Sequence, residues 1–148
     1  MSYQKVILVG RLGRDPEMRY TPNGTPVTNL SVATDRRWTN DDGSQVKETT
    51  WFRVTAWGRL AETCNQYLQK GRQVLVEGRV RGERVPQSDG SFNIQPRVWT
   101  GNDGVARASF EVTAQTVRFL GRAGETSLAA EPGVPEEPPV EEEEGIPF

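Results

Sequence analysis

Two tryptophans and two arginines alternate within one short stretch of the chain, and both residue types can hold nucleic acid. Trp51 and Trp57 share one side of a segment that alternates in polarity, with Arg53 between them and Arg59 following. Aromatic rings stack on unpaired bases of any sequence, and guanidinium groups neutralise phosphates. The pattern predicts binding to single-stranded nucleic acid without reading of its sequence.

The opposite side of the same segment is apolar. Phe52, Val54 and Ala56 alternate with the tryptophans, as expected for a half-buried strand. Tryptophan is buried in most proteins, so each ring taken alone is also compatible with a place in the core. Because the apolar side can supply the core, we expect Trp51 and Trp57 to lie outside it.

Two further tryptophans lie beside basic residues near expected turns. Trp38 follows Arg36 and Arg37, and Trp99 lies close to Arg97. Turn positions are harder to bury, so we expect both rings to be available to bases. Five more arginines are compatible either with a basic groove or with ordinary solvated charges: Arg72, Arg79, Arg81, Arg84 and Arg107.

The composition excludes several classes of enzyme. The chain has no His, and Cys64 is its only Cys, so neither a four-ligand Cys/His zinc site nor a His-activated nucleophile is available. Asp41 and Asp42 could form an acid–base pair, but an Asn-Asp-Asp-Gly turn accounts for them without catalysis. No phosphate-binding loop or dinucleotide motif occurs. We expect a binding protein without cofactors or metals, with Cys64 as a small buried residue.

Charge divides the chain into two parts. All 18 basic residues lie at or before Arg122, where 12 acidic residues leave a net charge of +6, whereas residues 123–148 hold 8 acids and no base. Several prolines in the second part and few large apolar side chains predict disorder. We expect a folded binding domain over residues 1–122 and a disordered acidic tail over residues 123–148.

The tail ends in an apolar triplet, Ile146-Pro147-Phe148, which follows a run of four acids that includes Glu143 and Glu144. A tail that serves solubility alone would end in polar residues. Phe148 can offer a ring and its α-carboxylate to a basic pocket lined by apolar side chains. We therefore predict a partner-binding tip, with a purely solubilising tail as the alternative.

The elements that must position these residues are mostly strands. Leu60, Cys64, Tyr67 and Leu68 follow a helical period, and Lys70 with Gly71 suits the end of that helix. Alternation and turn signals predict strands over residues 5–9, 26–34, 48–57, 73–80, 92–99 and 108–120. About five strands with one helix between the third and fourth predict an all-β, five-stranded Greek-key barrel of the OB-fold type, with one short helix and extended hairpins.

Several spaced motifs resemble bacterial single-stranded DNA-binding proteins. The resemblance covers about residues 3–120 and resumes at the last eight residues. Its motifs are Lys5–Glu17, Arg19–Gly24, Trp51–Val54, Trp57–Glu62, Tyr67–Gly71, Val76–Arg79 and the terminal Gly145–Phe148.

The resemblance implies an OB-fold that assembles as a homotetramer with single-stranded DNA wrapped over its outside. Trp38, Trp51 and Trp57 match the base-stacking positions of the family, and Arg37 stands beside the first of them. The family's basic positions along the DNA match Arg53, Arg59, Lys70, Arg81 and Arg84. The tail would recruit DNA replication, recombination and repair proteins, and could fold back on the basic groove when DNA is absent.

The chain departs from the family at three places. Val85 replaces a stacking tryptophan that some members carry, and Phe52 replaces a polar residue at a subunit contact. The segment 93–107 is longer than in those members and contains Trp99. We expect Trp99 to stack on a base, with a core or subunit-contact role as the alternative.

Two other binding functions remain to be weighed. An OB-fold replication accessory protein would bind nucleic acid without this tail, and a pure interaction protein would leave the basic, tryptophan-bearing strand unexplained. The chain shows no signal peptide and no apolar run near the roughly 18 residues of a membrane span. We expect a cytoplasmic, nucleoid-associated protein with no membrane partner.

Overall fold

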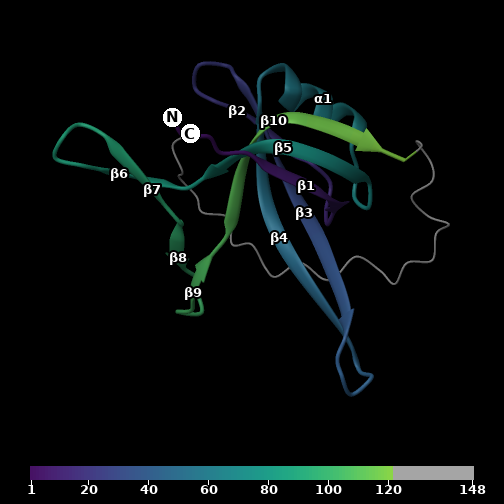
Figure 1. The fold of residues 1–148 in the computed structure, drawn as a ribbon. Helices are drawn as coiled ribbons and strands as arrows, with labels where there is room; N and C mark the ends of the chain where they lie inside the picture. The colour runs from purple at the N-terminus through teal and green to yellow at the C-terminus, as the bar shows by residue number, and fades with distance from the viewer. Residues whose placement is uncertain (122–148) are drawn as a thin grey trace.

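A computed structural model describes residues 1–121, which form a closed five-stranded barrel with one short helix (Figure 1). The barrel strands lie in the order β1-β5-β10-β4-β3, and β2 pairs with the outer edge of β3. The all-β barrel expected from the sequence is therefore confirmed. The strands of this sheet are β1 (Val6–Leu12), β2 (Glu17–Tyr20), β3 (Pro26–Thr39), β4 (Gln45–Trp57), β5 (Gln73–Arg81) and β10 (Phe110–Leu120).

The barrel closes where the end of β1 meets the middle of β3. Arg11 pairs with Ala33 and Leu12 with Val32. Gly10 makes this approach possible, because a Cβ atom at that position would lie 2.3 Å from the carbonyl oxygen of Ala33. A glycine is thus required where two backbones come closest.

The core contains small and branched apolar side chains, and α1 (Arg59–Tyr67) covers one end of it. Thr28 of β3 donates a 2.7 Å hydrogen bond from its hydroxyl to the carbonyl oxygen of Ala61, which fixes the helix to the barrel. The fully buried members include Leu12, Leu30, Val32, Val54, Ala56, Ala61, Cys64, Val74 and Val76. The sequence placed the end of the helix at Lys70 and Gly71. In the structure the helix already ends at Tyr67, and both residues lie in the turn that follows.

Strand β10 lies between β4 and β5, and it pairs parallel to β4 and antiparallel to β5. A bulge between Ala114 and Thr116 shifts its register. The single alternation predicted for residues 108–120 is wrong beyond this point, because Val117 and Phe119, rather than the even-numbered residues, then pack on the core.

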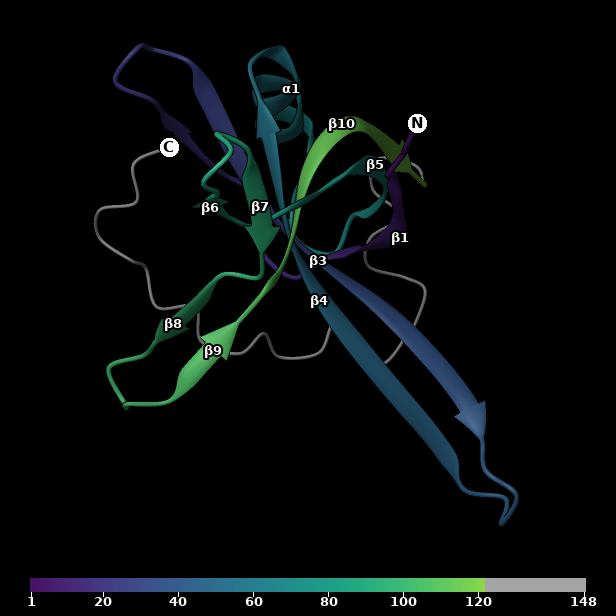
Figure 2. The same ribbon diagram turned by 60° about the vertical axis from the view of Figure 1, so that its left-hand side comes forward.

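Three hairpin arms extend from the barrel (Figure 2). The first is the outer part of β3–β4, and the others are β6 (Glu83–Pro86) with β7 (Phe92–Gln95) and β8 (Val98–Thr100) with β9 (Ala106–Ala108). The sequence predicted one strand over residues 92–99, but the structure divides it between two hairpins. Pro96 lies at the division, where its missing N–H cannot donate to a strand partner.

The three arms end in the same kind of turn. Asp42, Asp89 and Asp103 each precede a glycine with φ between +76° and +84°. Each carboxylate accepts a hydrogen bond from the backbone N–H two residues later. The pKa of Asp42 and of Asp89 is lowered mainly by the hydroxyl of the serine at that position, Ser44 or Ser91, and then by this backbone bond. The pKa of Asp103 is lowered mainly by the Val105 N–H and then by Arg107. The turn at residues 40–43, expected from the sequence, is confirmed and also explains Asp42 without catalysis.

Candidate nucleic-acid interface

The predicted division of β4 into two faces agrees with the structure. Val54 and Ala56 are fully buried, and Phe52 packs against the core from the same side. Trp51 and Trp57 lie on the other side and are partly exposed. Their cross-strand partners on β3 are Ala33 and Val27, which are both buried. The barrel therefore presents two rings on its outside.

A buried threonine between the two tryptophans holds an arginine on the same face. The Thr55 hydroxyl donates to Asn29 Oδ1 at 3.1 Å and accepts from Arg81 Nη1 at 2.9 Å. Arg81 is the last residue of β5, so this bond brings a cation from the far side of β10 to the tryptophan face. The prediction that Arg81 joins this surface thus has a geometric basis.

Arg53 lies at the centre of a group of arginines. Burial lowers the pKa of its guanidinium, the carboxylate of Glu111 raises it, and three further guanidiniums, those of Arg97, Arg14 and Arg81, lower it. Arg14 and Arg97 were not predicted as site residues. Arg14 follows β1 and Arg97 follows β7, so both lie far from Arg53 in the sequence. Only the fold brings them within electrostatic reach of Arg53.

Trp38 lies on the other face of the long β3–β4 arm. Along the arm, Arg37 pairs with Lys47, and both lie on the same face as Trp51. Trp38 pairs with Val46 on the reverse face. Trp38 is 37% exposed and donates from Nε1 to Asn40 at 3.1 Å. The Arg36 guanidinium lies 5.0 Å from its ring centroid. Trp38 is thus an exposed, cation-backed ring, and Lys47 is a further cation that the sequence reasoning missed.

The two basic residues near the helix lie at its opposite ends. Arg59 is exposed and begins α1 directly after Trp57 and Gly58. Lys70 is exposed in the turn after the helix, where its backbone N–H donates to Asp15 Oδ1 at 2.8 Å. Asp15 adjoins Arg14, so Lys70 lies beside the loop that carries one of the arginines around Arg53.

The last two predicted contacts lie on separate arms. On β6–β7, the Arg84 guanidinium lies 5.9 Å from the Phe92 ring centroid. On β8–β9, Trp99 pairs with Arg107 and is partly exposed like Trp51 and Trp57, but its Nε1 is buried without a hydrogen-bond partner. Arg107 is held by Asp103 at 2.6 Å. The structure therefore does not join Trp99 and Arg84 to the β4 face through any direct contact it describes.

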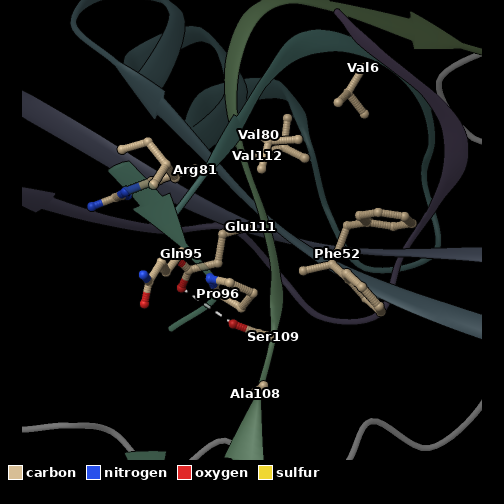
Figure 3. A pocket seen from close by; sticks show the side chains of 12 residues that line it. Val6, Phe52, Val80, Arg81, Gln95, Pro96, Ala108, Ser109, Glu111 and Val112 are labelled. Carbon is tan, nitrogen blue, oxygen red and sulfur yellow. Dashed lines mark hydrogen bonds between the residues drawn. The ribbon is translucent and has the colours of Figure 1, made fainter. Parts of the chain in front are cut away.

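An apolar cavity of about 230 Å³ lies between β4, β5, β10 and β7, and Phe52, Val80, Phe110 and Ile94 are among the residues that line it (Figure 3). The rings of Phe52 and Phe110 lie 5.8 Å apart along one wall. The guanidinium of Arg81 points away from the cavity, whereas Glu111 lies on its wall and accepts a hydrogen bond from Ser109 at 3.3 Å. The cavity is therefore unlike the basic tryptophan face, and its apolar lining suits contact with protein.

Comparison with known proteins decides the family. Residues 3–120 match the model of the single-strand binding protein family. The chain belongs to this family. Two members, the single-stranded DNA-binding proteins of Neisseria meningitidis serogroups A and B, are each 43% identical over 130 residues, which cover 88% of this chain and 67% of theirs. The predicted resemblance is thereby confirmed.

A solved structure supports the same conclusion. A deletion mutant of the single-stranded DNA binding protein from Thermus aquaticus matches with a TM-score of 0.57 and 28% identity. The match covers 79% of this chain and only 50% of the other. It confirms the OB-fold, and membership of the single-strand binding protein family makes this chain a DNA-binding protein rather than an enzyme.

The predicted partner-binding tip and the predicted lack of a membrane span remain to be placed. The tail residues Glu143, Glu144, Ile146, Pro147 and Phe148 lie outside the described residues. Among residues 1–121, no helix is both long and apolar enough to cross a bilayer.

Proposed function

We propose that single-stranded DNA lies across the outer face of β4, with bases stacked on Trp51 and Trp57 and phosphates near Arg53 and Arg81. The observation that carries this proposal is the separation of the two faces of β4. Its inner face supplies the core, whereas the two partly exposed rings lie on the opposite face with Arg53 between them. Stacking of this kind tolerates any base, because every base has a π-face.

The same DNA would continue along basic residues on both sides of this face. Arg37 and Lys47 extend it toward the tip of the β3–β4 arm, and DNA that passes around the tip would meet the Trp38 ring on the reverse face. Arg59, Lys70 and Arg84 extend it around the barrel. Trp99 is the weakest member of the proposed set, because it lies on the separate β8–β9 arm and its indole nitrogen is buried.

A tryptophan-fluorescence titration tests the main proposal. Long oligo-dT and a duplex of equal length are added at low and at high salt. Strong quenching by the single strand, little by the duplex, and loss of binding at high salt support stacking with phosphate neutralisation. Absence of quenching, or an equal response to duplex, would contradict it.

We also propose that the protein assembles as a homotetramer. Within residues 1–121, the edge of β1 from Val6 to Gly10 that faces away from β5 has no neighbouring strand. Ile7 and Val9 on this strand are 60% and 49% exposed. An open edge can pair with the same edge of a second copy around a two-fold axis, and the exposed apolar face can then stack two such dimers.

The cavity beside Phe52 and Phe110 would lie at this assembly. Val6 both begins β1 and lines the cavity, so a second copy paired along β1 would stand next to it. This location agrees with the expectation that Phe52 replaces a polar residue at a subunit contact.

Sedimentation velocity tests the assembly. The 16.5 kDa chain is expected to sediment as a tetramer, and Ile7→Glu is expected to dissociate it by placing charge in the interface. Tyr20→Ala removes an equally exposed apolar side chain from β2 and is the control. A monomeric wild-type protein would refute the proposal.

For residues 123–148 we propose recruitment of DNA replication, recombination and repair proteins through the terminal Ile146-Pro147-Phe148. This proposal rests on the sequence, in which acids precede an apolar triplet. A synthetic peptide of residues 141–148 should compete with the full chain for such an enzyme. A peptide with Phe148→Ala should not compete, and equal competition by both peptides would contradict the proposal.

A further inference from the structure

A buried carboxylate lies among the arginines on the tryptophan face of β4. Glu111 of β10 is 8% exposed, and within residues 1–121 it is the one charged residue that is buried. The proposed function leaves it unexplained, because a carboxylate repels the phosphates that this face is proposed to hold. A buried charge is stable only with an opposite charge and hydrogen bonds nearby. The partners of Glu111 therefore indicate what its charge does.

The register of the sheet places Glu111 between two arginines. It pairs with Arg53 on β4 and with Arg81 on β5. Paired residues on neighbouring strands point to the same face, so Arg53, Glu111 and Arg81 form one row across three strands. Figure 3 shows the side chains of Glu111 and Arg81 on one side of β10 and that of Phe52 on the other. The acid thus has a cation on each side.

Both arginines of this row are held near the acid. Strand β10 lies between β4 and β5, so the 2.9 Å hydrogen bond from Arg81 Nη1 to the Thr55 hydroxyl on β4 crosses β10. Glu111 acts electrostatically on Arg53 and favours its charged form, against the repulsion of three neighbouring guanidiniums. Glu111 also lines the apolar cavity, where little water screens its charge. Without this carboxylate, repulsion would drive the guanidiniums apart into solvent.

We propose that Glu111 is a positioning residue for single-stranded DNA, whose carboxylate holds the guanidiniums of Arg53 and Arg81 where they meet phosphates. The proposal rests on the proposed function, because it takes those two arginines as phosphate contacts. A long side chain that is already ordered loses less conformational entropy on binding. The acid therefore strengthens binding although its own charge repels DNA.

The main experiment removes the charge of Glu111 and keeps its shape. Glu111→Gln in the full chain is expected to weaken binding to long oligo-dT by about fivefold or more, because two arginines must then be ordered by the DNA itself. Anisotropy of a labelled oligonucleotide measures this loss. The amide oxygen can still accept the hydrogen bond from Ser109, which limits disturbance of the fold.

A second acid provides the matched control. Glu83 is exposed on β6, two residues after Arg81, and does not lie in the row of Glu111. Glu83→Gln removes the same charge and should leave affinity unchanged or slightly higher, because less negative charge repels the DNA. Opposite effects of the two substitutions distinguish positioning from simple repulsion.

Two further measurements separate positioning from a general structural role. Glu111→Asp keeps a carboxylate between the arginines and should retain most of the affinity that Glu111→Gln loses. The slope of log affinity against log salt should be smaller in magnitude for Glu111→Gln, by up to about 0.7 for each arginine that no longer meets a phosphate. This change is expected although the variant has lost no cation.

A variant without the two arginines tests the route of the effect. In an Arg53→Gln, Arg81→Gln background, Glu111 no longer has either of its paired cations to position. Glu111→Gln should then leave affinity unchanged or raise it, because contributions that depend on one another are not additive.

Four results would overturn the proposal. The first is unchanged or higher affinity in Glu111→Gln, and the second is a Glu111→Asp variant as weak as Glu111→Gln. The third is the same loss in the background without the two arginines, since the effect would then not pass through them. The fourth is loss of oligomer mass in Glu111→Gln with unchanged DNA affinity, which would assign the acid to a subunit contact. Failure of the wild-type chain to bind oligo-dT would instead refute the proposed function itself.

Discussion

Trp51 and Trp57 lie six residues apart on one face of β4, so a strand rise of about 3.3 Å places them about 20 Å apart. Replacing either ring by alanine removes one stacking site, which costs about 1–3 kcal/mol. At this separation the two sites share no contacts, and energies of sites more than about 7–10 Å apart add. The double variant is therefore expected to lose about 2–6 kcal/mol on long oligo-dT.

Oligonucleotide length gives this prediction a second readout. Stacked bases follow one another at about 3.4 Å, so the two rings are about six steps apart and roughly seven nucleotides are needed to span both. A four-nucleotide oligo-dT should engage one ring at a time. Each single variant should then lose much less affinity than on a long strand, because the remaining ring still provides a site.

Anisotropy of a labelled oligonucleotide at fixed salt measures the DNA affinity of the wild type, the two single variants and the double variant. It does not rely on tryptophan fluorescence, which the substitutions change. Thr50→Ala on the opposite face is the control for general disturbance of β4, and it should leave DNA affinity unchanged. Unchanged affinity in both single variants would refute the stacking assignment. A double variant no weaker than either single variant would refute the arrangement of two independent sites along one strand.

Three further predictions concern the barrel and the tail. Gly10→Ala should lower the free energy of unfolding by about 1–3 kcal/mol, because the added Cβ would collide with the Ala33 carbonyl. Urea denaturation measures this change. A variant as stable as the wild type would show that β1 can move aside. Burial raises the pKa of Cys64 to about 11 from 9.0. The unfolded thiol ionises first, so stability present below pH 9 should fall by up to about 2–3 kcal/mol as the pH rises to 11; a Cys64→Ala variant with the same decline between pH 9 and 11 would contradict this. Deleting residues 141–148 removes four negative charges and should leave oligo-dT affinity unchanged or higher; a large loss would show that the tail contributes to DNA binding.

The parts of the fold that depend on local pattern were predictable. The inner face of β4 appears in the sequence as Phe52, Val54 and Ala56, and the structure buries that side. The helix at residues 59–67 follows from the period of Leu60 and Cys64. In both cases, one buried face repeats at the period of a single element.

The parts that depend on distant pairing were not predictable. The bulge after Ala114 appears only once β10 is paired with β5. Pro96 marks a break in residues 92–99, but which strands pair on either side of it is a property of the arms. The grouping of Arg14 and Arg97 around Arg53 likewise joins residues from three separate segments.

The position of β10 also determines when the protein can fold during its synthesis. Val6 pairs with Gly78, 72 positions later, so at about 5–20 residues per second β1 is made roughly 4–14 s before its partner. Strand β10 lies between β4 and β5 in the sheet, and the barrel cannot close until Leu120 has left the ribosome. Pairing over such distances makes folding slow, on the order of milliseconds to seconds once the chain is complete. The apolar β1 segment of a nascent chain is thus a site where a chaperone would have time to bind.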